Sequence, residues 1–447
     1  MKDKIVSEKL TSLQLPGLKT DSATEGFARE VVLERGVKKM VLLPDTFTKE
    51  KYLHRGYKIT IPSSSVISTQ SDILYPQFRS RGINCGMMVI ALPVTKDELS
   101  KNMVTSLLNN ITYSLGYYIG YRLRFPILNR KEDLSLREFD KVLEEGPQAL
   151  SKTRDVTRKD IEALEFKGGR EVNLKEARHL LNPDWFNYQA VRLRHAFGTY
   201  FGGNHFFEIQ EVTSLGTDRL GLSVGQVVIM FHGGCDSVET LIRKDLVEKY
   251  IKKSSFTSVS KREEMWQAFF TAQDIIINYT SAYRLNTFLL VNKAIQSFLG
   301  DRTSASIVLE RGHNTVRQED SLSGSSLVYR HNAERIISGS HTILSGSRTH
   351  ESYIIEGGEG TADYLSTIDH GLGAILGRNE AVQDKVADAD SVELHEFKRG
   401  IRQFHSKSVA PLVKNEIVDT YFDLIGRERL AKPVATLRPL VNVKFTR

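Results

Sequence analysis

Four cysteine and histidine residues each have a glycine within three residues, and three of the four follow or lie within short apolar runs of β type. They are Cys85 in GINCGMM, His205 in GGNHFFEI, His232 in VVIMFHGGCD and His313 in LERGHNTV. Thiolate and imidazole bind divalent metals such as Zn²⁺, Mn²⁺ and Co²⁺, and an adjoining glycine lets the backbone approach closely. The spacing of the four matches no short metal-binding motif, so a buried core role is the alternative for each one taken alone.

A fifth histidine has a different setting. His370 lies between Asp369 and a Gly-Leu-Gly turn in STIDHGLGAILG. A neutral imidazole is a competent nucleophile toward an activated phosphorus, and the neighbouring glycines would give a phosphate room and backbone N–H donors. The stretch ILSGSRTHESY around Ser347 could hold phosphate oxygens in the same way. An ordinary turn is the alternative for both stretches, and Lys444 in LRPLVNVKF would by itself be a solvated lysine of a terminal strand.

The elements that position these residues follow from the hydrophobic pattern. Residues 1–98 contain short β-type runs bounded by Pro, Ser and Gly, such as GYKITIPSSSVIS. Helical spacing of Leu, Ile and Val predicts helices within 99–195 and 260–300, while 197–235 returns to strands and short strands and loops follow 300. We predict an α+β fold in a single domain that spans residues 1–447.

Composition and charge narrow the class of protein. The chain has 447 residues, of which 40% are hydrophobic and 26% charged, as in globular proteins. Its longest apolar run, CGMMVIALPV, is too short to span a bilayer, and two cysteines exclude a disulfide framework. We therefore expect a soluble cytoplasmic protein. The 61 basic and 54 acidic residues give a net charge of +7, a mild excess that is compatible with a polyanionic partner.

The motifs together resemble the RtcB family of RNA ligases. These enzymes join a 3′-phosphate or 2′,3′-cyclic phosphate end of RNA to a 5′-hydroxyl end, with GTP and manganese. FGTYFGGNHFFEIQEV is similar to the family's Gly-Asn-His-Phe-x-Glu signature. The other blocks that resemble the family follow in order over roughly residues 40 to 444: LLPD, INCGM, KVLEEG, IMFHGG, GHN, GSRTHESY, DHGLG and LRPLVNVK.

The resemblance implies a fold of β-sheets around a metal and nucleotide site, with flanking helices. It implies that Cys85, His205, His232 and His313 bind two Mn²⁺ ions, with the thiolate between them, and that His370 forms a covalent histidine–GMP intermediate. The positions similar to the family's GMP site are Asn204, His205, Phe206, Phe207, Glu208, His313, Asn314, Ser345, Gly346, Ser347, Arg348, Ser352, His370, Gly371, Leu372, Gly373 and Lys444.

The chain departs from the family pattern beside these residues. Gly82 stands where the family usually has a metal-binding aspartate, which puts the second ion in doubt. Asp236 and Ala374 stand where it has arginines, and Arg348 stands where it has methionine. Loss of arginine weakens a bidentate grip on phosphate. Residues that could compensate are Arg348 or Arg378 for the arginines, and Asp236 or Asp45 for the carboxylate.

Two classes of function follow. The first is GTP-dependent ligation of RNA ends in RNA repair or tRNA splicing. The second is a divergent paralogue that binds RNA ends or guanine nucleotide without ligating them. A metal-dependent phosphodiesterase that acts only on cyclic phosphate ends is a third reading. The physiological RNA, the metal, the oligomeric state and any protein activator stay open at this point.

Overall fold

The computed structural model describes most of the chain. The described residues are 2–18, 20–47, 61–80, 82–115, 117–118, 134–181, 183–189, 193–194, 197, 200–201, 205–217, 219–234, 241, 256–300, 304–321, 324–347, 350–378, 392–397, 401–406 and 416–445.

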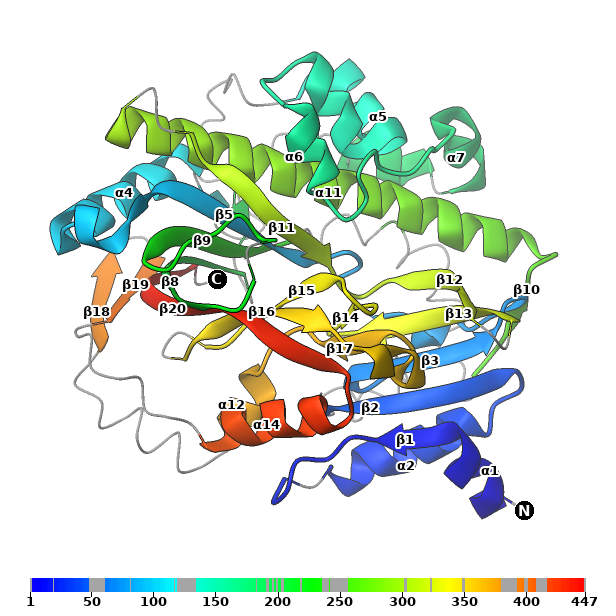
Figure 1. The fold of residues 1–447 in the computed structure, drawn as a ribbon. Coiled ribbons are helices and arrows are strands. Elements are labelled where there is room, and N and C mark those ends of the chain that lie inside the picture. The colour runs from blue at the N-terminus through cyan, green and yellow to red at the C-terminus, as the bar shows by residue number, and fades with distance from the viewer. Residues whose placement is uncertain are drawn as a thin grey trace.

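Two larger sheets dominate the described part of the chain (Figure 1). The five-stranded sheet has the order β1 (Leu10–Ser12), β2 (Val37–Phe47), β3 (Ser63–Gln70), β13 (Gly324–His331) and β12 (Val316–Ser321). The nine-stranded sheet has the order β11 (Ser306–Gly312), β5 (Gly86–Thr95), β9 (Gln226–Gly233), β8 (Phe206–Leu215), β20 (Ala431–Phe445), β16 (Ser352–Gly357) and β15 (His341–Leu344), with β18 (Val392–Phe397) and β19 (Ile401–Ser406) joined through β20. The remaining strands are short pairs: β4 (Ile73–Leu74) with β10 (Val259–Ser260), β14 (Ala333–Arg335) with β17 (Thr367–Asp369), and β6 (Tyr117–Tyr118) with β7 (Tyr200–Phe201).

The nine-stranded sheet curls nearly into a barrel. Its two end strands, β11 and β15, approach each other, and Arg311 of β11 donates a hydrogen bond from Nε to the backbone oxygen of His341 in β15 at 3.0 Å. The curl brings β17, which precedes His370, close to the ends of β5 and β9 that carry the cysteine and histidine residues, as the ring contacts described below show.

Helices cover both sheets. The described helices are α1 (Lys2–Lys9), α2 (Ser22–Val32), α4 (Lys101–Leu115), α5 (Leu136–Glu145), α6 (Arg158–Glu162), α7 (Leu174–Leu180), α11 (Glu264–Leu299), α12 (Gly373–Arg378) and α14 (Glu416–Arg427). The layer of α4 to α7 and α11 lies over one side of the nine-stranded sheet, and α1 and α2 lie beside β1 and β2 (Figure 1). None of the helices in these segments is both long and apolar enough to cross a membrane.

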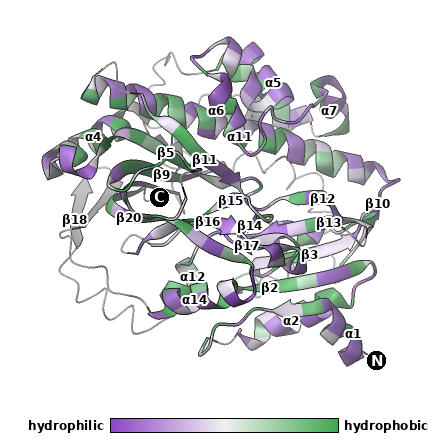
Figure 2. Ribbon diagram, in the orientation of Figure 1, coloured by the Kyte–Doolittle hydropathy of each residue, from purple (hydrophilic) through white to green (hydrophobic). Residues whose placement is uncertain are grey.

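The helix α11 forms the centre of the largest hydrophobic core. Its buried residues run from Trp266 to Ile295 and pack with the inner face of β5, β8 and β9, including Ile90 and Phe231. Figure 2 shows hydrophobic residues along these strands and α11. This long apolar helix was expected from the sequence between 260 and 300, and its buried polar residues, which include Arg284, bond to the functional site.

Local sequence accounts for the helix ends. Ser135 caps α5 by accepting a hydrogen bond from Glu138 N, while Glu138 accepts one from Ser135 N. Phe139, Val142 and Leu143 then bury one face of the helix.

Residues 1–98 hold the expected strands, β1 to β5, and they also hold the helices α1 and α2, which the sequence pattern did not predict. Helix α2 begins after Asp21, whose carboxylate accepts a hydrogen bond from Thr24 N at 2.8 Å, and it buries Ala28, Val31 and Val32 at helical spacing. Helix α14 likewise occupies a region expected to hold only short strands and loops, and it buries Val418, Tyr421 and Leu424. In both segments one apolar face docks on a sheet, and this outweighs the β-branched residues that favour strands.

Candidate active site

The four expected metal-binding residues stand at strand ends on one edge of the nine-stranded sheet. Cys85 directly precedes β5 and His205 directly precedes β8, while His232 lies near the end of β9 and His313 directly follows β11. These strands are antiparallel neighbours, so the start of each adjoins the end of the next. The order of the strands therefore brings together residues that are far apart in the sequence.

The ligand atoms lie close enough to share a metal ion. Sγ of Cys85 is 3.1 Å from Nε2 of His232 and 3.4 Å from Nε2 of His205, and Nε2 of His232 is 3.4 Å from Nε2 of His313. Cys85, His232 and His313 form a buried group whose ligand atoms all lie within 4.8 Å of one another. His205 is outside this group, but its Nε2 lies 3.4 Å from the same thiol and its ring centroid lies 5.3 Å from that of His232.

The surroundings fit a cation. Burial lowers the pKa of His313 well below its usual value, and His370 and His232 add to the shift, so its imidazole is neutral and can act as a ligand. The backbone leaves room for the thiol at Gly234, where a Cβ atom would lie 2.7 Å from Sγ of Cys85. A soft thiolate and neutral imidazoles suit a divalent transition metal.

A buried arginine holds the segments that carry these residues. Arg284 of α11 donates from Nη1 to the backbone oxygen of Asn84 at 2.6 Å and of Gly233 at 3.2 Å, beside Cys85 and His232 respectively. Its Nε donates to Glu310 of β11 at 2.6 Å. One side chain thus ties three of the strand ends to the central helix.

His370 stands over the same group, at the end of β17. Its ring centroid is 4.7 Å from that of His313 and 6.3 Å from that of His232. Its Nδ1 lies 3.0 Å from the backbone oxygen of Asn332, which can only accept, so Nδ1 carries the hydrogen and Nε2 carries the lone pair. Burial lowers the pKa of His370 to about 4, with His331 adding to the shift, so the imidazole is neutral at physiological pH.

Two glycine-containing loops meet beside His370. Ser345 N donates to the backbone oxygen of His370 at 3.2 Å, and Leu372 N donates to the backbone oxygen of Ser345 at 2.8 Å. Ser352 of β16 accepts a hydrogen bond from Gly346 N at 3.0 Å and links this loop to β8, since Gln210 donates to the same hydroxyl at 3.3 Å. The structure thus brings the 345–347, 352 and 370–373 stretches together.

Glu208 is one of the buried carboxylates of this region. It accepts hydrogen bonds from the side chains of Gln210 (2.7 Å) and Asn442. Burial raises its pKa to about 8, although the two amide donors oppose the shift. Phe206 packs its ring 5.6 Å from that of His232, whereas the alternate residue Phe207 stacks on Phe231 in the core beneath. Only the backbone of Phe207 therefore faces the site side of the sheet.

Asn314 bonds to the segment beside His370 and to the turn before Cys85. It has a φ of 63° and accepts a hydrogen bond from Asn332 N at 2.6 Å, while its amide donates to the backbone oxygen of Gly82 at 3.1 Å. It therefore connects the peptide that holds His370 with the turn before Cys85.

Of the four residues that could compensate for the missing carboxylate and arginines, the structure describes the side chain of one, Asp45. Asp45 of β2 is buried, and its Oδ1 accepts a hydrogen bond at 2.5 Å from Ile375 N in the first turn of α12. Asn204, Asp236 and Arg348 lie outside the described residues, as do the side chains of Arg378 and Lys444. Leu372 packs its side chain in a second core, which leaves its backbone to the site.

Several residues of the site carried no sequence signal. Arg284, Glu310 and Gln210 lie within ordinary helix and strand patterns, and Glu334 lies in the three-residue strand β14. Their role arises from contacts across the fold. A buried charge at an apolar helical position, as at Arg284, is the one signal that could have been noticed.

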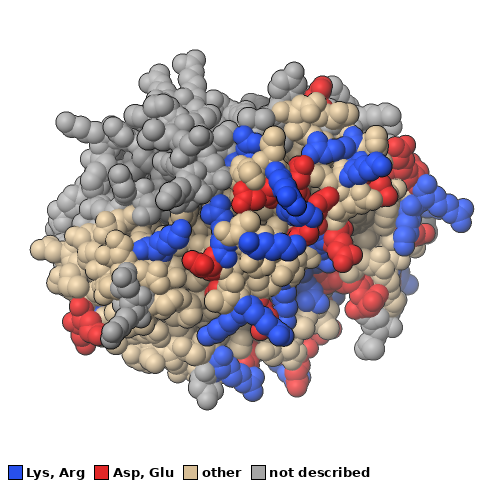
Figure 3. Space-filling model, turned by 90° about the horizontal axis from the view of Figure 1, so that it is seen from above, with Lys and Arg blue, Asp and Glu red and all other residues tan. Residues whose placement is uncertain are grey.

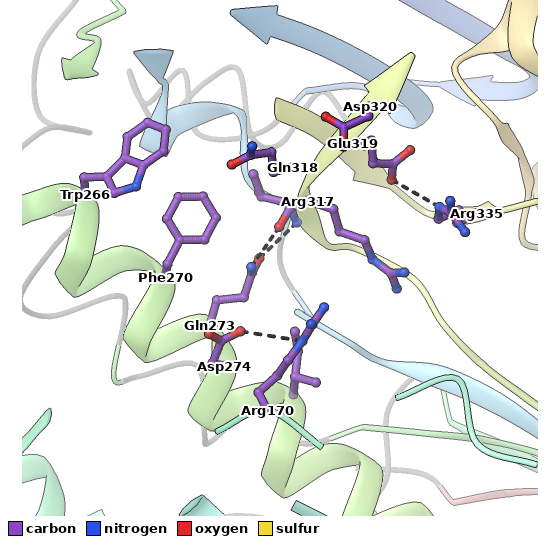
Figure 4. Close-up of a pocket in the computed structure, with 12 residues that line it drawn as sticks. Arg170, Trp266, Phe270, Gln273, Asp274, Arg317, Gln318, Glu319, Asp320 and Arg335 are labelled. Carbon is purple, nitrogen blue, oxygen red and sulfur yellow. Dashed lines mark hydrogen bonds and ion pairs between the residues drawn. The ribbon is translucent and has the colours of Figure 1, made fainter. Parts of the chain in front are cut away.

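A second hollow lies away from this edge, between α11 and β12 (Figure 4). It has a volume of about 650 Å³ and is walled by Trp266 and Phe270. Three arginines that line it are already paired with carboxylates: Arg170 with Asp274 (3.9 Å), Arg317 with Glu165 (2.5 Å) and Arg335 with Glu319 (3.4 Å). These pairs reduce its attraction for an anion.

Comparisons with known proteins agree with the geometry. A family profile described as tRNA-splicing ligase RtcB matches residues 29–445. The chain is 25% identical to the tRNA-splicing ligase RtcB of Thermococcus kodakarensis over 95% of this chain and 91% of that protein. It is 25% identical to the protein of the same name from Nanoarchaeum equitans over 93% and 90% of the two chains, and 24% identical to RNA-splicing ligase RtcB homolog 2 of Entamoeba dispar over 96% and 84%.

Proposed function

Because the chain belongs to the RtcB family, we propose that it is an RNA ligase. Its substrates would be RNA 3′-phosphate or cyclic phosphate ends and 5′-hydroxyl ends, joined at the expense of GTP in RNA repair or tRNA splicing. We extend the proposal to the whole chain, residues 1–447, as one ligase domain in the cytoplasm.

One observation supports this proposal more than any other. A neutral imidazole, His370, stands beside a buried group of one thiol and two imidazoles, with its Nδ1 hydrogen held by the backbone oxygen of Asn332. The Nε2 lone pair is then available for attack on the α-phosphorus of GTP. The new P–N bond would form as the bond to pyrophosphate breaks, and the Asn332 oxygen would stabilise the charge that develops on the ring.

Two further transfers would complete the ligation. An oxygen of the RNA 3′-phosphate would displace His370 and take the GMP group, and the 5′-hydroxyl oxygen would then attack that phosphate and release GMP. We propose Mn²⁺ as the metal, held by Cys85, His205, His232 and His313, where it would neutralise phosphate charge. Glu208 and the loop around Ser345 would contact the guanosine nucleotide.

Labelled GTP tests the proposal. Protein incubated with [α-³²P]GTP and Mn²⁺ should acquire a label that is lost in acid and survives base, as a phosphoramidate does. His370→Ala should abolish it, whereas His341→Ala, which removes a histidine that pairs with Glu356, should retain it. A labelled His370→Ala protein would contradict the assignment of the nucleophile.

The same assay separates the alternatives. A paralogue that only binds would retain GTP without forming the adduct. A phosphodiesterase would open a cyclic phosphate end without GTP and without joining the RNA. Ligation of an RNA with a 3′-phosphate to one with a 5′-hydroxyl, dependent on GTP, is the outcome that the proposed function requires.

A further inference from the structure

Two buried polar atoms face each other at the edge of the site, and neither has a hydrogen-bond partner among the described residues. They are Nδ1 of His313 and Oε1 of Glu334, which lie 4.0 Å apart. The two side chains are 2% and 0% exposed, so water does not solvate them from the surface. Buried polar atoms are nearly always paired, and this facing pair indicates a state of the site in which the two atoms are bonded.

The fold fixes the orientation of the carboxylate. Glu334 lies in β14, which pairs with the strand before His370, and its backbone forms an isolated antiparallel bridge with His313. Its Oε2 accepts a hydrogen bond from the hydroxyl of Thr342, and Ile343 N–H also contacts the carboxylate. Anchoring Oε2 leaves Oε1 directed at the His313 ring.

The other nitrogen of the same ring belongs to the candidate metal group. Nε2 of His313 lies 3.4 Å from Nε2 of His232 and within the group that includes Cys85. An imidazole that binds a metal through one nitrogen carries its hydrogen on the other, and a carboxylate that accepts this hydrogen fixes the ring and its tautomer. The geometry thus has the parts of a carboxylate–histidine–metal arrangement.

We propose that Glu334 is a positioning residue that accepts a hydrogen bond from Nδ1–H of His313 when a divalent metal is bound at Nε2. Glu334 touches neither metal nor substrate. The step needs only a closure of about 1 Å, from 4.0 Å to an ordinary hydrogen-bond length of about 3 Å. This inference rests on the metal site of the proposed function, and it adds a residue to which neither the sequence motifs nor the family resemblance assigned a role.

Cobalt binding tests it without GTP or RNA. Co²⁺ titrated into the full chain should give a thiolate-to-cobalt absorption band from Cys85, which reports affinity directly. Glu334→Gln should weaken Co²⁺ binding by about 10- to 100-fold. Glu334→Asp, with a shorter reach, and Thr342→Val, which releases Oε2, should each give smaller losses. Asp274→Asn, a carboxylate of the second hollow, serves as the matched control and should bind as the parent does.

Thermal unfolding separates positioning from a purely structural role. A structural role alone would lower the melting temperature of metal-free Glu334→Gln and leave its Co²⁺ affinity unchanged. Positioning instead leaves the metal-free melting temperature near that of the parent, because Oε1 of Glu334 has no hydrogen-bond partner to lose, and it shrinks the rise that Co²⁺ produces.

A failure of the positioning role can be distinguished from a failure of the metal site. If folded Glu334→Gln binds Co²⁺ with an affinity within about twofold of the parent, the positioning role is overturned and the metal site stays intact. Removal of a side chain that accepts a hydrogen bond from a metal ligand should cost more than this. If that variant does not fold, parental affinity in both Glu334→Asp and Thr342→Val would overturn it equally. A parent protein that binds no Co²⁺ would overturn the metal site of the proposed function together with this inference.

Discussion

His370 and Glu208 are both buried, and burial shifts the pKa values of the two groups in opposite directions because it disfavours whichever form is charged. The imidazole, with its pKa near 4, stays neutral as a base, and the carboxyl, with its pKa near 8, keeps its proton through neutral pH. These two side chains therefore add little charge to the site at neutral pH. A nucleotide and a metal ion would supply opposite charges that balance each other.

The Glu208 carboxyl should make stability depend on pH. Its pKa is raised to about 8 in the folded protein, so between about pH 4.5 and 8 the folded state holds a proton that the unfolded chain has released. The free energy of unfolding therefore falls as the pH rises, by at most about 1.4 kcal/mol per pH unit. Glu208→Gln should reduce this slope, while Glu334, whose pKa burial raises well above its usual value, contributes equally to the parent and the variant.

Melting temperatures from about pH 6.5 to 8.5 provide the measurement, because His370 and His313, with lowered pKa values, contribute a slope only below their unfolded pKa of about 6.5. Glu351, whose pKa burial also raises, provides the control variant Glu351→Gln. Equal pH slopes for the parent and Glu208→Gln would show that this carboxyl ionises normally.

Restoring the absent carboxylate at Gly82 meets an obstacle in the backbone. Gly82 has a φ of +73°, and a Cβ atom there would lie 3.2 Å from Nδ2 of Asn314. Gly82→Asp and Gly82→Asn should both lose about 1 kcal/mol or more of stability, since both residues tolerate this conformation better than other side chains but remain strained. The aspartate should nevertheless bind Mn²⁺ more tightly, because a carboxylate oxygen suits this metal.

The asparagine variant isolates the charge, since it has the same shape and strain. Calorimetric titration with Mn²⁺, on parent and both variants, measures affinity and stoichiometry. Equal affinity of Gly82→Asp and Gly82→Asn would mean that no ion lies within reach of position 82.

Among the elements, α11 contributes to the site as well as to the core. Arg284 of this helix bonds to Glu310 and to two backbone oxygens beside the metal group. Arg284→Met should cost about 3–5 kcal/mol of unfolding free energy, because it leaves Glu310 buried without its partner. Adding Glu310→Leu should recover much of this loss.

Metal affinity should behave differently from stability in this pair of variants. The double variant still lacks the donor that holds the oxygens of Asn84 and Gly233, so its Co²⁺ affinity should stay below that of the parent. Chemical unfolding and Co²⁺ titration on the same samples make the comparison. Parental Co²⁺ affinity in the double variant would restrict Arg284 to a role in stability.

The elements also show how far the sequence could lead. The family and the mixed α and β fold are confirmed, and α11 follows from a long helical pattern of apolar residues. Helices α1, α2 and α14 were missed because short amphipathic helices depend on the sheet against which they dock. Cys85 and His232 could be singled out beside glycines, whereas Arg284 and Glu334 gain their roles from partners distant in the chain, which no local pattern encodes.

For the whole molecule, the question is where a chain with 61 basic and 54 acidic residues would bind RNA. On the face of the helical layer, basic and acidic side chains are interspersed (Figure 3). Pairs such as Lys141 with Glu145 and Arg178 with Asp140 lie on α5 and α7. The basic side chains of this face are therefore partly engaged in local ion pairs, and we expect few RNA phosphates to contact it.

RNA binding should accordingly show a moderate dependence on salt. If the complex involves about 3 to 5 phosphate contacts, the logarithm of the affinity should fall with the logarithm of salt concentration with a slope of about −2 to −3.5, as expected for a single strand. Between about 50 and 200 mM salt this is a loss of roughly 20- to 130-fold. The measurement is fluorescence anisotropy with a short single-stranded RNA that bears a 3′-phosphate.

The same RNA with a 3′-hydroxyl is the matched control. A metal site that holds the terminal phosphate should make the 3′-phosphate RNA bind more tightly, and His232→Ala, which removes a residue of the metal group, should remove this difference while leaving most of the salt slope. A flat dependence on salt would exclude counterion release as the source of affinity and argue against RNA as the partner. Equal affinity for the two RNAs, with a normal slope, would instead show that the protein binds the strand without capturing its end at the metal group.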